Sequence, residues 1–242
     1  MNFIIILLEG GILIIAMLWD FDGVVVNTPH EEAWRKTALK FGIRDFTSEF
    51  YHKYVAGKPR IEGARVILEY YGLLRGLREE DANQFVLRFA EEKNKVFKEL
   101  IMQGLYSINI DVLGFIEKTK YLSERLKFIH VLASASRNVS ELSKVITVNS
   151  KSLIDYFDVD VSGSASTKKG VFENGVRRVG VADCYLAVDD APSGITAALE
   201  LDIIPIGYRA RDLLKYGASL VVDSFKNFEP EVIVRLCRQT SN

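Results

Sequence analysis

In the second half of the chain, the pattern of hydrophobic and polar positions predicts short strands that alternate with helices. Stretches with helical periodicity, such as Gly170–Val179 and Ser193–Glu200, separate short apolar runs rich in β-branched residues. Strands in alternation with helices indicate a parallel sheet with helices on both faces. We therefore predict an α/β fold with a doubly wound parallel sheet. Its six strands are expected at Ile12–Trp19, Phe128–Ala133, Val159–Val161, Tyr185–Val188, Ile203–Ile206 and Leu220–Val222.

One long segment interrupts this alternation. The chain between Asp22 and Ser134 is far longer than a single crossover helix requires. Three stretches in it, Glu31–Phe41, Ile61–Tyr71 and Glu79–Met102, have helical periodicity and mixed charge. These helices would either extend the core layer or form a separate cap, and the cap is favoured because the insert leaves from an acidic strand end. We predict a helical cap domain over residues 29–105 and a catalytic core from residues 1–28 and 106–242.

The apolar N-terminal segment does not have the features of a signal peptide or membrane anchor. No Lys or Arg precedes it, and Glu9-Gly10-Gly11 divides it into pieces too short to span about 30 Å of hydrocarbon. We interpret Ile12–Trp19 as a buried parallel strand, since strands covered on both faces are continuously apolar. Phe3–Leu8 is either an additional strand or lies upstream of the natural start, for which Met17 is another candidate.

Composition and charge exclude some classes of partner. The chain has 48% hydrophobic and 26% charged residues, and its 31 basic and 32 acidic residues are mixed without a basic tract. Nucleic acid is therefore not an expected partner. Cys184 and Cys237 are far apart and match no metal-ligand spacing, so we expect two buried free thiols in a reducing cytoplasm. The predicted protein is cytoplasmic, has no membrane partner, and is a monomer or a small homo-oligomer.

Two pairs of acids follow two of the apolar runs. Asp20 and Asp22 share a face of the extended chain, and Gly23 then allows a sharp turn. Asp189 and Asp190 end another run in the same way. One such pair alone is typical of an exposed turn, but four carboxylates at neighbouring strand ends repel one another strongly unless a cation lies between them. Ligand sets made only of oxygen favour Mg²⁺, so Mg²⁺ is the predicted cofactor.

Phosphoryl transfer is the chemistry that such a metal site favours. A fixed carboxylate can attack phosphorus in line, and a second acid can handle the proton. A hydroxyl and a cation are also needed to hold the phosphoryl oxygens. Ser134, after a predicted strand, and either Lys168 or Lys169 have suitable side chains.

Four segments in order resemble the four motifs of the haloacid dehalogenase superfamily: WDFDGVVVNT, ASASRN, STKKG and DDAPSGITAA. The resemblance extends from about residue 12 to the end of the chain and implies a Rossmann-like core. It also implies that Asp20 is the nucleophile and that Asp22 is the general acid/base, whose backbone carbonyl faces the metal. Ser134 would bind the transferring phosphoryl group and the motif lysine, taken as Lys168, would stabilise it. The implied metal site consists of Asp20, Asp22, Asp189 and Asp190.

The insert is similar to the cap of the β-phosphoglucomutase-like branch. The similar segments are HEEAW (30–34), VAGKPR (55–60) and EEKN (91–94), with Arg137-Asn138 after the second motif. The resemblance implies that Arg60, Arg137 and Asn138 bind the distal phosphate of the substrate. It further implies that His30 and Lys93 control acid/base chemistry and substrate orientation. Judged by residue type alone, Arg60 is equally typical of a solvated helix start, Lys93 of a surface position and Trp34 of a cap core.

Some positions depart from the mutase pattern. Asn27 replaces a common acid, and the segment from Thr28 to His30 is two residues shorter than in the mutase. The third motif lacks its usual KPxP continuation, and Asp189 stands where the mutase has glutamate. These departures favour a phosphatase of a small phosphorylated metabolite, such as a sugar phosphate. The alternative is a β-phosphoglucomutase-type isomerase. Two further alternatives are less consistent with the sequence. Dehalogenation does not need the acid cluster, and a non-catalytic binding module does not need the complete set of catalytic residue types.

Overall fold

The computed structural model describes residues 11–239. The predicted alternatives for Phe3–Leu8 lie outside these residues. The chain divides into two compact units, one made of residues 1–27 and 108–242 and the other of residues 28–107. The helical insert predicted over residues 29–105 falls inside the second unit. The first unit is called the core and the second the cap.

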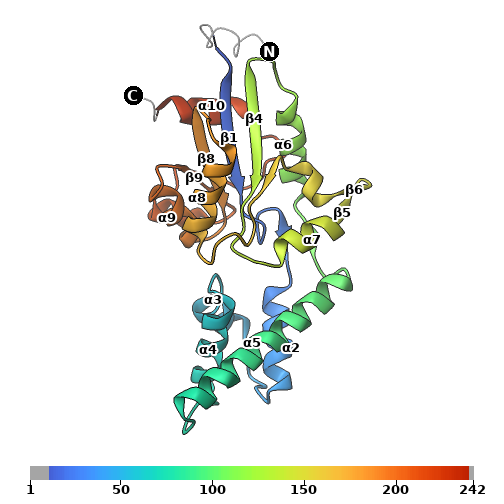
Figure 1. The fold of residues 1–242 in the computed structure, drawn as a ribbon, viewed down its shortest axis with the longest axis vertical. Helices are drawn as coiled ribbons and strands as arrows, with labels where there is room; N and C mark the ends of the chain where they lie inside the picture. The colour runs from blue at the N-terminus through green and yellow to red at the C-terminus, as the bar shows by residue number, and fades with distance from the viewer. Residues whose placement is uncertain (1–10, 240–242) are drawn as a thin grey trace. The chain divides into compact units, whose positions relative to one another are not determined.

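The core contains a six-stranded parallel sheet, which confirms the predicted α/β fold class (Figure 1). Its strands follow the order β10-β9-β8-β1-β4-β7, so the chain builds outward from β1 first in one direction and then in the other. Ligands of such sheets bind beyond the carboxyl ends of the strands at this reversal. The strands are β1 (Leu13–Trp19), β4 (Leu126–Leu132), β7 (Val159–Asp160), β8 (Cys184–Asp189), β9 (Ile204–Tyr208) and β10 (Leu220–Val222).

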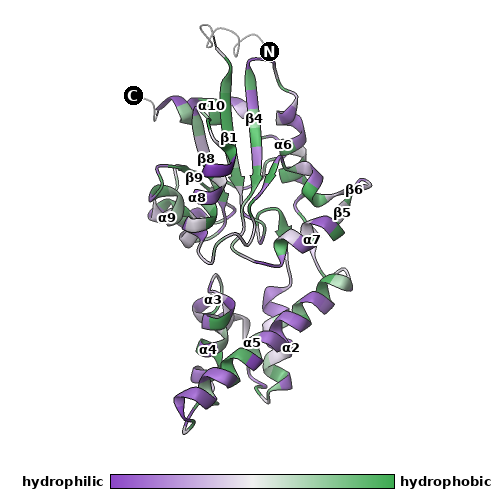
Figure 2. Ribbon diagram, in the orientation of Figure 1, coloured by the Kyte–Doolittle hydropathy of each residue, from purple (hydrophilic) through white to green (hydrophobic). Residues whose placement is uncertain are grey.

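β1 lies at the centre of the sheet and is hydrophobic along almost its whole length (Figure 2). Every residue from Ile15 to Trp19 is completely buried. Alternate residues face opposite sides of a sheet. Leu18 packs in a cluster with residues of the helices α8 (Lys168–Val179) and α9 (Pro192–Leu199). Trp19 contacts Phe115 of the helix α6 (Ile110–Lys120) at a ring-centroid distance of 6.1 Å. Both faces are thus covered, which explains why the strand shows no polar alternation.

Helices and short elements complete the core. The helices are α6 (Ile110–Lys120), α7 (Val139–Val145), α8 (Lys168–Val179), α9 (Pro192–Leu199) and α10 (Pro230–Gln239). Two 3₁₀ helices are η1 (Leu153–Tyr156) and η2 (Arg211–Tyr216). Two small sheets pair β2 (Val26–Asn27) with β3 (Ser107–Ile108) and β5 (Thr147–Val148) with β6 (Lys151–Ser152).

The cap consists of four helices around an aromatic core. They are α2 (His30–Lys40), α3 (Ser48–Tyr54), α4 (Arg60–Tyr70) and α5 (Glu79–Met102). Trp34 is 5% exposed and stacks on Phe89, as expected of a cap-core residue. No helix among residues 11–239, not even the 24-residue α5 with its many charges, combines the length and apolarity that crossing a membrane requires.

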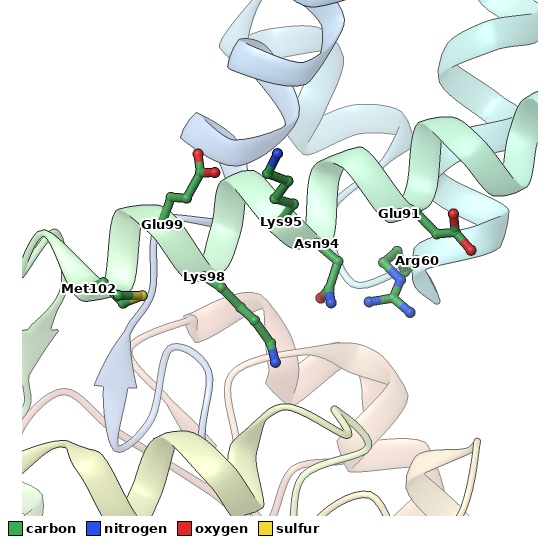
Figure 3. A pocket seen from close by; sticks show the side chains of 7 residues that line it. All are labelled: Arg60, Glu91, Asn94, Lys95, Lys98, Glu99 and Met102. Carbon is green, nitrogen blue, oxygen red and sulfur yellow. The ribbon is translucent and has the colours of Figure 1, made fainter.

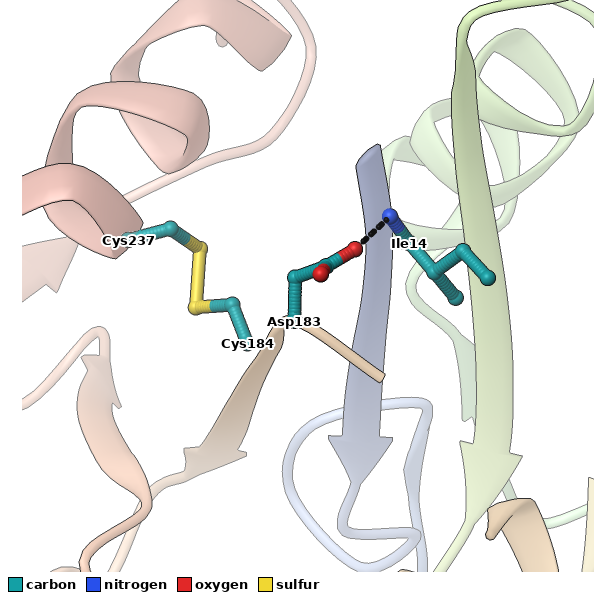
Figure 4. The surroundings of a disulfide bond; sticks show 4 residues. All are labelled: Ile14, Asp183, Cys184 and Cys237. Carbon is teal, nitrogen blue, oxygen red and sulfur yellow. Dashed lines mark hydrogen bonds between the residues drawn. A yellow bond between two sulfur atoms is a disulfide. The ribbon is translucent and has the colours of Figure 1, made fainter. Parts of the chain in front are cut away.

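The two cysteines form a disulfide, so the prediction of two free thiols is wrong (Figure 4). Cys184 is the first residue of β8 and shares a sheet face with Leu186, opposite Ala187 and the α8–α9 cluster. Cys237 of α10 meets it on that face. A separation of 53 residues contains no information about this proximity. The preceding residue, Asp183, anchors the same end of the sheet by accepting a hydrogen bond from the Ile14 N–H at 2.7 Å.

Candidate active site

The ends of β1 and β8 bring three carboxylates together. The register pairs Trp19 with Val188, so Asp20 lies beside Asp189, and the Asp20 N–H donates to the Val188 carbonyl at 3.0 Å. Oxygens of Asp20, Asp189 and Asp190 all lie within 4.8 Å of one another. Asp20 and Asp189 are 6% and 1% exposed, so both carboxylates are largely removed from bulk water.

Asp22 follows in a tight turn. Gly23 has φ +83°, in the left-handed region that favours glycine, and its N–H donates to the Val26 carbonyl at 2.8 Å. The charge of Asp22 helps to raise the pKa values of Asp20 and Asp190, which places its carboxylate within electrostatic range of the cluster. The structure thus places Asp22 on the turn immediately beyond Asp20.

Lys168 supplies a cation inside the cluster. It is the first residue of α8, whose N-cap Thr167 accepts a hydrogen bond from the Gly170 N–H. Its Nζ lies 2.6 Å from Asp20 Oδ1 and 3.0 Å from Asp189 Oδ2. Lys169 instead pairs with Glu200 at 3.0 Å. Of the two lysines that the sequence left as alternatives, Lys168 is the one that contacts the acids.

Burial and charge set the protonation of this group. Burial raises the pKa of Asp20 well above its ordinary value, and the neighbouring carboxylates raise it further, while Lys168 opposes them. Burial alone would lower the pKa of Lys168, but Asp189 and Asp20 outweigh that effect and raise it. Lys168 is therefore a permanent cation, and the cluster still carries an excess of negative charge.

The residues present fit a divalent cation. Burial raises the pKa of Asp190 to about 7, assisted by the charges of Asp189 and Asp22, so the Asp190 carboxyl resists ionisation without further positive charge. A Cβ on Gly23 would overlap the Asp190 carboxylate, and one on Gly194 would overlap that of Asp189. Glycines thus allow close approach around an all-oxygen set of the kind that Mg²⁺ prefers.

Ser134 and the next residues approach from the other neighbour of β1. The Ala133 N–H donates to the Trp19 carbonyl at 2.8 Å, which brings Ser134 to the same sheet edge as Asp20. Ser134 is buried, and its Oγ accepts a hydrogen bond from the Ser136 N–H at 3.2 Å. Arg137 is exposed and Asn138 is the N-cap residue of α7, so both lie in the same loop as Ser134.

The cap brings His30 and Lys93 into direct contact. Lys93 Nζ lies 2.7 Å from His30 Nδ1, and the imidazole stacks on Phe97 at 4.4 Å between centroids. Lys93 is only 4% exposed, and its ammonium lies 5.1 Å from the ring centroid of Trp34. The interpretation of Lys93 as a surface residue is therefore wrong, because the aromatic side chains of the cap enclose it.

A separate feature of the cap is a pocket of about 400 Å³ along α5 (Figure 3). In the figure Asn94 and Lys98 extend from the same side of α5, with Arg60 of α4 beside Asn94. Positions three, four, seven and eight apart share one helix face, which explains how one helix supplies most of the lining. The lining residues are Arg60, Glu91, Asn94, Lys95, Lys98, Glu99 and Met102.

Comparison with protein-family models and with curated proteins finds no match. Among solved structures, the chain is similar to the archaeal β-phosphoglucomutase of the hyperthermophile Pyrococcus sp. strain ST 04. The two share 37% identity over 93% of this chain and 99% of the other, with a TM-score of 0.79. The chain belongs to the haloacid dehalogenase superfamily, in its β-phosphoglucomutase-like branch.

Two further solved structures are similar to this chain. The β-phosphoglucomutase of Clostridium difficile is 27% identical over 93% of this chain and 97% of its own, with a TM-score of 0.70. A predicted phosphatase of Clostridium acetobutylicum shares the fold at 19% identity and a TM-score of 0.65, with 94% and 98% of the two chains covered. Of these three similar proteins, the two above 25% identity are thus both described as β-phosphoglucomutases, and the predicted phosphatase shows the fold alone.

Sequence reasoning did not single out Lys98 as a candidate site residue of this haloacid dehalogenase member. Asn94 belongs to the EEKN segment, in which the resemblance implies a role for Lys93 alone. The available signal was helical spacing, because Glu91, Asn94 and Lys98 lie at i, i+3 and i+7 within α5. The spacing alone did not identify these three residues as a group, because α5 contains many other charged residues.

Proposed function

We propose that this chain transfers a phosphoryl group of a phosphorylated sugar through an aspartyl-phosphate on Asp20, with a sugar hydroxyl as the final acceptor. The observation that carries the proposal is the buried contact of Lys168 with both Asp20 and Asp189. It combines a carboxylate nucleophile with a cation placed to balance the charge of incoming phosphate oxygens.

In the proposed reaction, an oxygen of Asp20 attacks phosphorus while the bond to the sugar oxygen breaks. Asp22 gives a proton to that leaving oxygen and later takes one from the incoming hydroxyl. Lys168 and Ser134 hold the phosphoryl oxygens. Asp20, Asp189 and Asp190 would bind Mg²⁺, with the Asp22 backbone carbonyl as a further ligand. When bound, the ion neutralises charge on the phosphoryl group.

The choice of a sugar hydroxyl as acceptor rests on the cap and on similarity. The His30–Lys93 contact is buried against Phe97 and Trp34 and is therefore too ordered to be an incidental surface pair. The 37% identity to a protein described as a β-phosphoglucomutase supports the same reaction type. In this proposal the pair orients the substrate and influences the proton transfers of Asp22.

Hydrolysis is the second candidate, and the departures of the sequence from the mutase pattern favour it. The observation that favours it is Asp189, which stands at a position where the mutase has glutamate. Water would then take the place of the sugar hydroxyl, and free phosphate would be the product. Both candidates share the aspartyl-phosphate and differ only in what attacks it.

Substrate binding is proposed for both units. Arg60 would bind the distal phosphate, since an arginine fork suits phosphate geometry. Its pocket also contains Lys95 and Lys98, against the acids Glu91 and Glu99. Arg137 and Asn138 of the core are proposed to contact a phosphate of the substrate.

One assay separates the two candidates. The protein is incubated with β-glucose 1-phosphate, Mg²⁺ and a trace of glucose 1,6-bisphosphate, and both glucose 6-phosphate and free phosphate are followed. Glucose 6-phosphate formed faster than free phosphate is the expected result, whereas free phosphate with little isomer would establish hydrolysis. Asp20→Asn is the control. Turnover by Asp20→Asn would overturn the proposal. A wild-type protein that acts on no sugar phosphate would overturn it as well.

A further inference from the structure

Asn109 binds three consecutive backbone carbonyls of the turn that follows Asp22. Its backbone N–H donates to the Val25 carbonyl at 3.0 Å. Its side-chain Nδ2 donates to the Val24 carbonyl at 2.7 Å and to the Gly23 carbonyl at 3.2 Å. One residue thus holds the whole turn from the side, 86 positions away from Gly23 in the sequence.

Every hydrogen-bond donor and acceptor of the Asn109 side-chain amide has a partner. Its Oδ1 accepts from Asn27 Nδ2 at 3.1 Å and from Arg209 Nη1 at 3.0 Å, while both Nδ2 hydrogens go to carbonyls. An asparagine amide has two donors and two acceptor lone pairs, so no capacity remains. Asn109 is 5% exposed, and a buried network with every group satisfied fixes one geometry.

Arg209 completes the network from the end of β9. Its backbone has φ +58°, a conformation that non-glycine residues rarely adopt, and its N–H donates to the Val222 carbonyl. Its guanidinium lies 4.7 Å from the Tyr208 ring centroid and 3.9 Å from Asp111 Oδ1. These contacts hold the guanidinium where it donates to Asn109.

The turn that Asn109 holds lies against the acid cluster. Gly23 follows Asp22 directly, and its Cα lies so close to Asp190 that a side chain there would overlap the carboxylate. A displacement of the Gly23–Val25 carbonyls would therefore move Asp22 relative to Asp20. The chain also leaves the core after Asn27 and returns at Ile108, so the network joins both crossings.

We propose that Asn109 is a positioning residue that holds Asp22 where it can protonate the leaving oxygen, with Arg209 orienting the Asn109 amide. The inference rests on the proposed aspartyl-phosphate chemistry. In the step concerned, the Asp20–phosphorus bond forms, the phosphorus–oxygen bond to the leaving group breaks, and the proton of Asp22 passes to the leaving oxygen. A poor leaving group such as a sugar alkoxide needs that proton, whereas the anion of an activated aryl ester does not.

The test compares kcat/KM for phosphate release from glucose 1,6-bisphosphate and from p-nitrophenyl phosphate. Each ester phosphorylates Asp20 directly, so its kcat/KM reports the steps up to enzyme phosphorylation. Asn109→Asp keeps the shape of the side chain but places an oxygen against the Gly23 and Val24 carbonyls. We expect it to lower kcat/KM for the sugar ester at least about tenfold, and that for the aryl ester by less than about threefold. A residue with a merely structural role would lower both equally.

Arg209→Ala provides a second variant that is expected to fold, since the Arg209 side chain is 47% exposed. It should show the same selective loss, smaller in size. Asn83→Ala, which removes an exposed asparagine hydrogen-bonded to Arg65 in the cap, is the matched control and should leave the ratio of the two kcat/KM values unchanged.

Two outcomes contradict different statements. If Asn109→Asp and Arg209→Ala both leave the ratio of the two kcat/KM values unchanged, the positioning role alone would be overturned. A wild-type protein that turns over neither ester would overturn the proposed function, and the positioning role with it.

Discussion

At the scale of single residues, charge balance explains the most about the site. Lys168 contacts Asp20 and Asp189, and two further carboxylates, Asp190 and Asp22, lie within electrostatic range. One ammonium cannot balance four carboxylates. We expect the excess negative charge to give the cluster an affinity for a cation.

We expect Asp20→Asn to abolish turnover, because an amide cannot form the aspartyl-phosphate. The two remaining acids should still bind Mg²⁺, although less tightly, and the fold should be retained. Steady-state turnover together with circular dichroism measures both effects. Steady turnover by pure Asp20→Asn would show that another residue is the nucleophile.

We expect Mg²⁺ affinity to depend on pH through Asp190. Its pKa of about 7 in the metal-free protein means that a proton competes with the ion at lower pH. Affinity should fall by up to about tenfold per pH unit below 7 and level off above it. Titration calorimetry from pH 5.5 to pH 8.5 measures this, and Asp190→Asn should bind weakly with a flatter profile. An equally steep profile in that variant would assign the proton to another group.

At the scale of elements, the strands were the most predictable feature. The β1 pattern is unambiguous because both of its faces are covered, and all six predicted runs overlap strands of the sheet. The proximity of Asp20 and Asp189 followed, because parallel strands end at one edge. The seven-residue α3 was not predicted, since its turn is set by the Thr47 cap and by aromatic packing rather than by a long periodic pattern.

Contacts between distant elements could not be predicted from the sequence. The burial of Lys93 depends on how α2 and α5 pack, and the role of Asn109 depends on where the chain returns to the core. A periodicity identifies the face of a helix but not its partner. The short third motif is a related case, because α8 begins at Lys168 itself and so aims that side chain at the acids.

The strand β4 carries a buried histidine that should make stability depend on pH. His130 accepts a hydrogen bond from Trp19 Nε1 at Nδ1 and lies 2.9 Å from Thr119 Oγ1 at Nε2. Burial lowers its pKa from 6.5 to about 3, with Lys120 assisting. Between about pH 3 and pH 6.5, His130 binds a proton in the unfolded chain but not in the folded chain. The contribution of the neutral His130 to stability is therefore complete above about pH 6.5 and is lost as the pH falls.

We expect His130→Gln to remove part of this dependence. In the wild type the unfolding free energy should fall by up to about 1.4 kcal/mol per pH unit below 6.5 through this group. Urea unfolding at pH 5.0, 5.75 and 6.5 measures the slope. His52→Gln, an exposed cap position, is the control. Equal slopes in the wild type and in His130→Gln would show that His130 does not cause the dependence.

At the scale of the whole molecule, the disulfide joins the C-terminal helix to the central sheet. Disulfides are common in oxidising compartments and inside hyperthermophiles and are rare in other cytosols, so the bond argues against the reducing environment that the sequence predicted. Cys184 lies at the end of β8 opposite Asp189, so the bond stabilises the sheet without touching the acids.

We expect the double variant Cys184→Ser, Cys237→Ser to lose about 2–4 kcal/mol of unfolding free energy, because the unfolded chain gains freedom. Its Mg²⁺ affinity should not change. Denaturant unfolding with and without a reductant measures the effect. The reductant should destabilise the wild type and have no effect on the variant, and a variant as stable as the oxidised wild type would show that the bond contributes nothing.

The same bond closes a ring of backbone that contains β8, α9, β9 and β10, and therefore both Asp189 and Asp190. A protease that cuts once within that ring, for example in the exposed 3₁₀ turn around Leu214, leaves the two fragments covalently joined. Such a nicked molecule would migrate as one species without reductant and as two with it. The C-terminal fragment, which contains β10 and α10, would thus remain attached to β8 after a break that would release it from a chain without the bond.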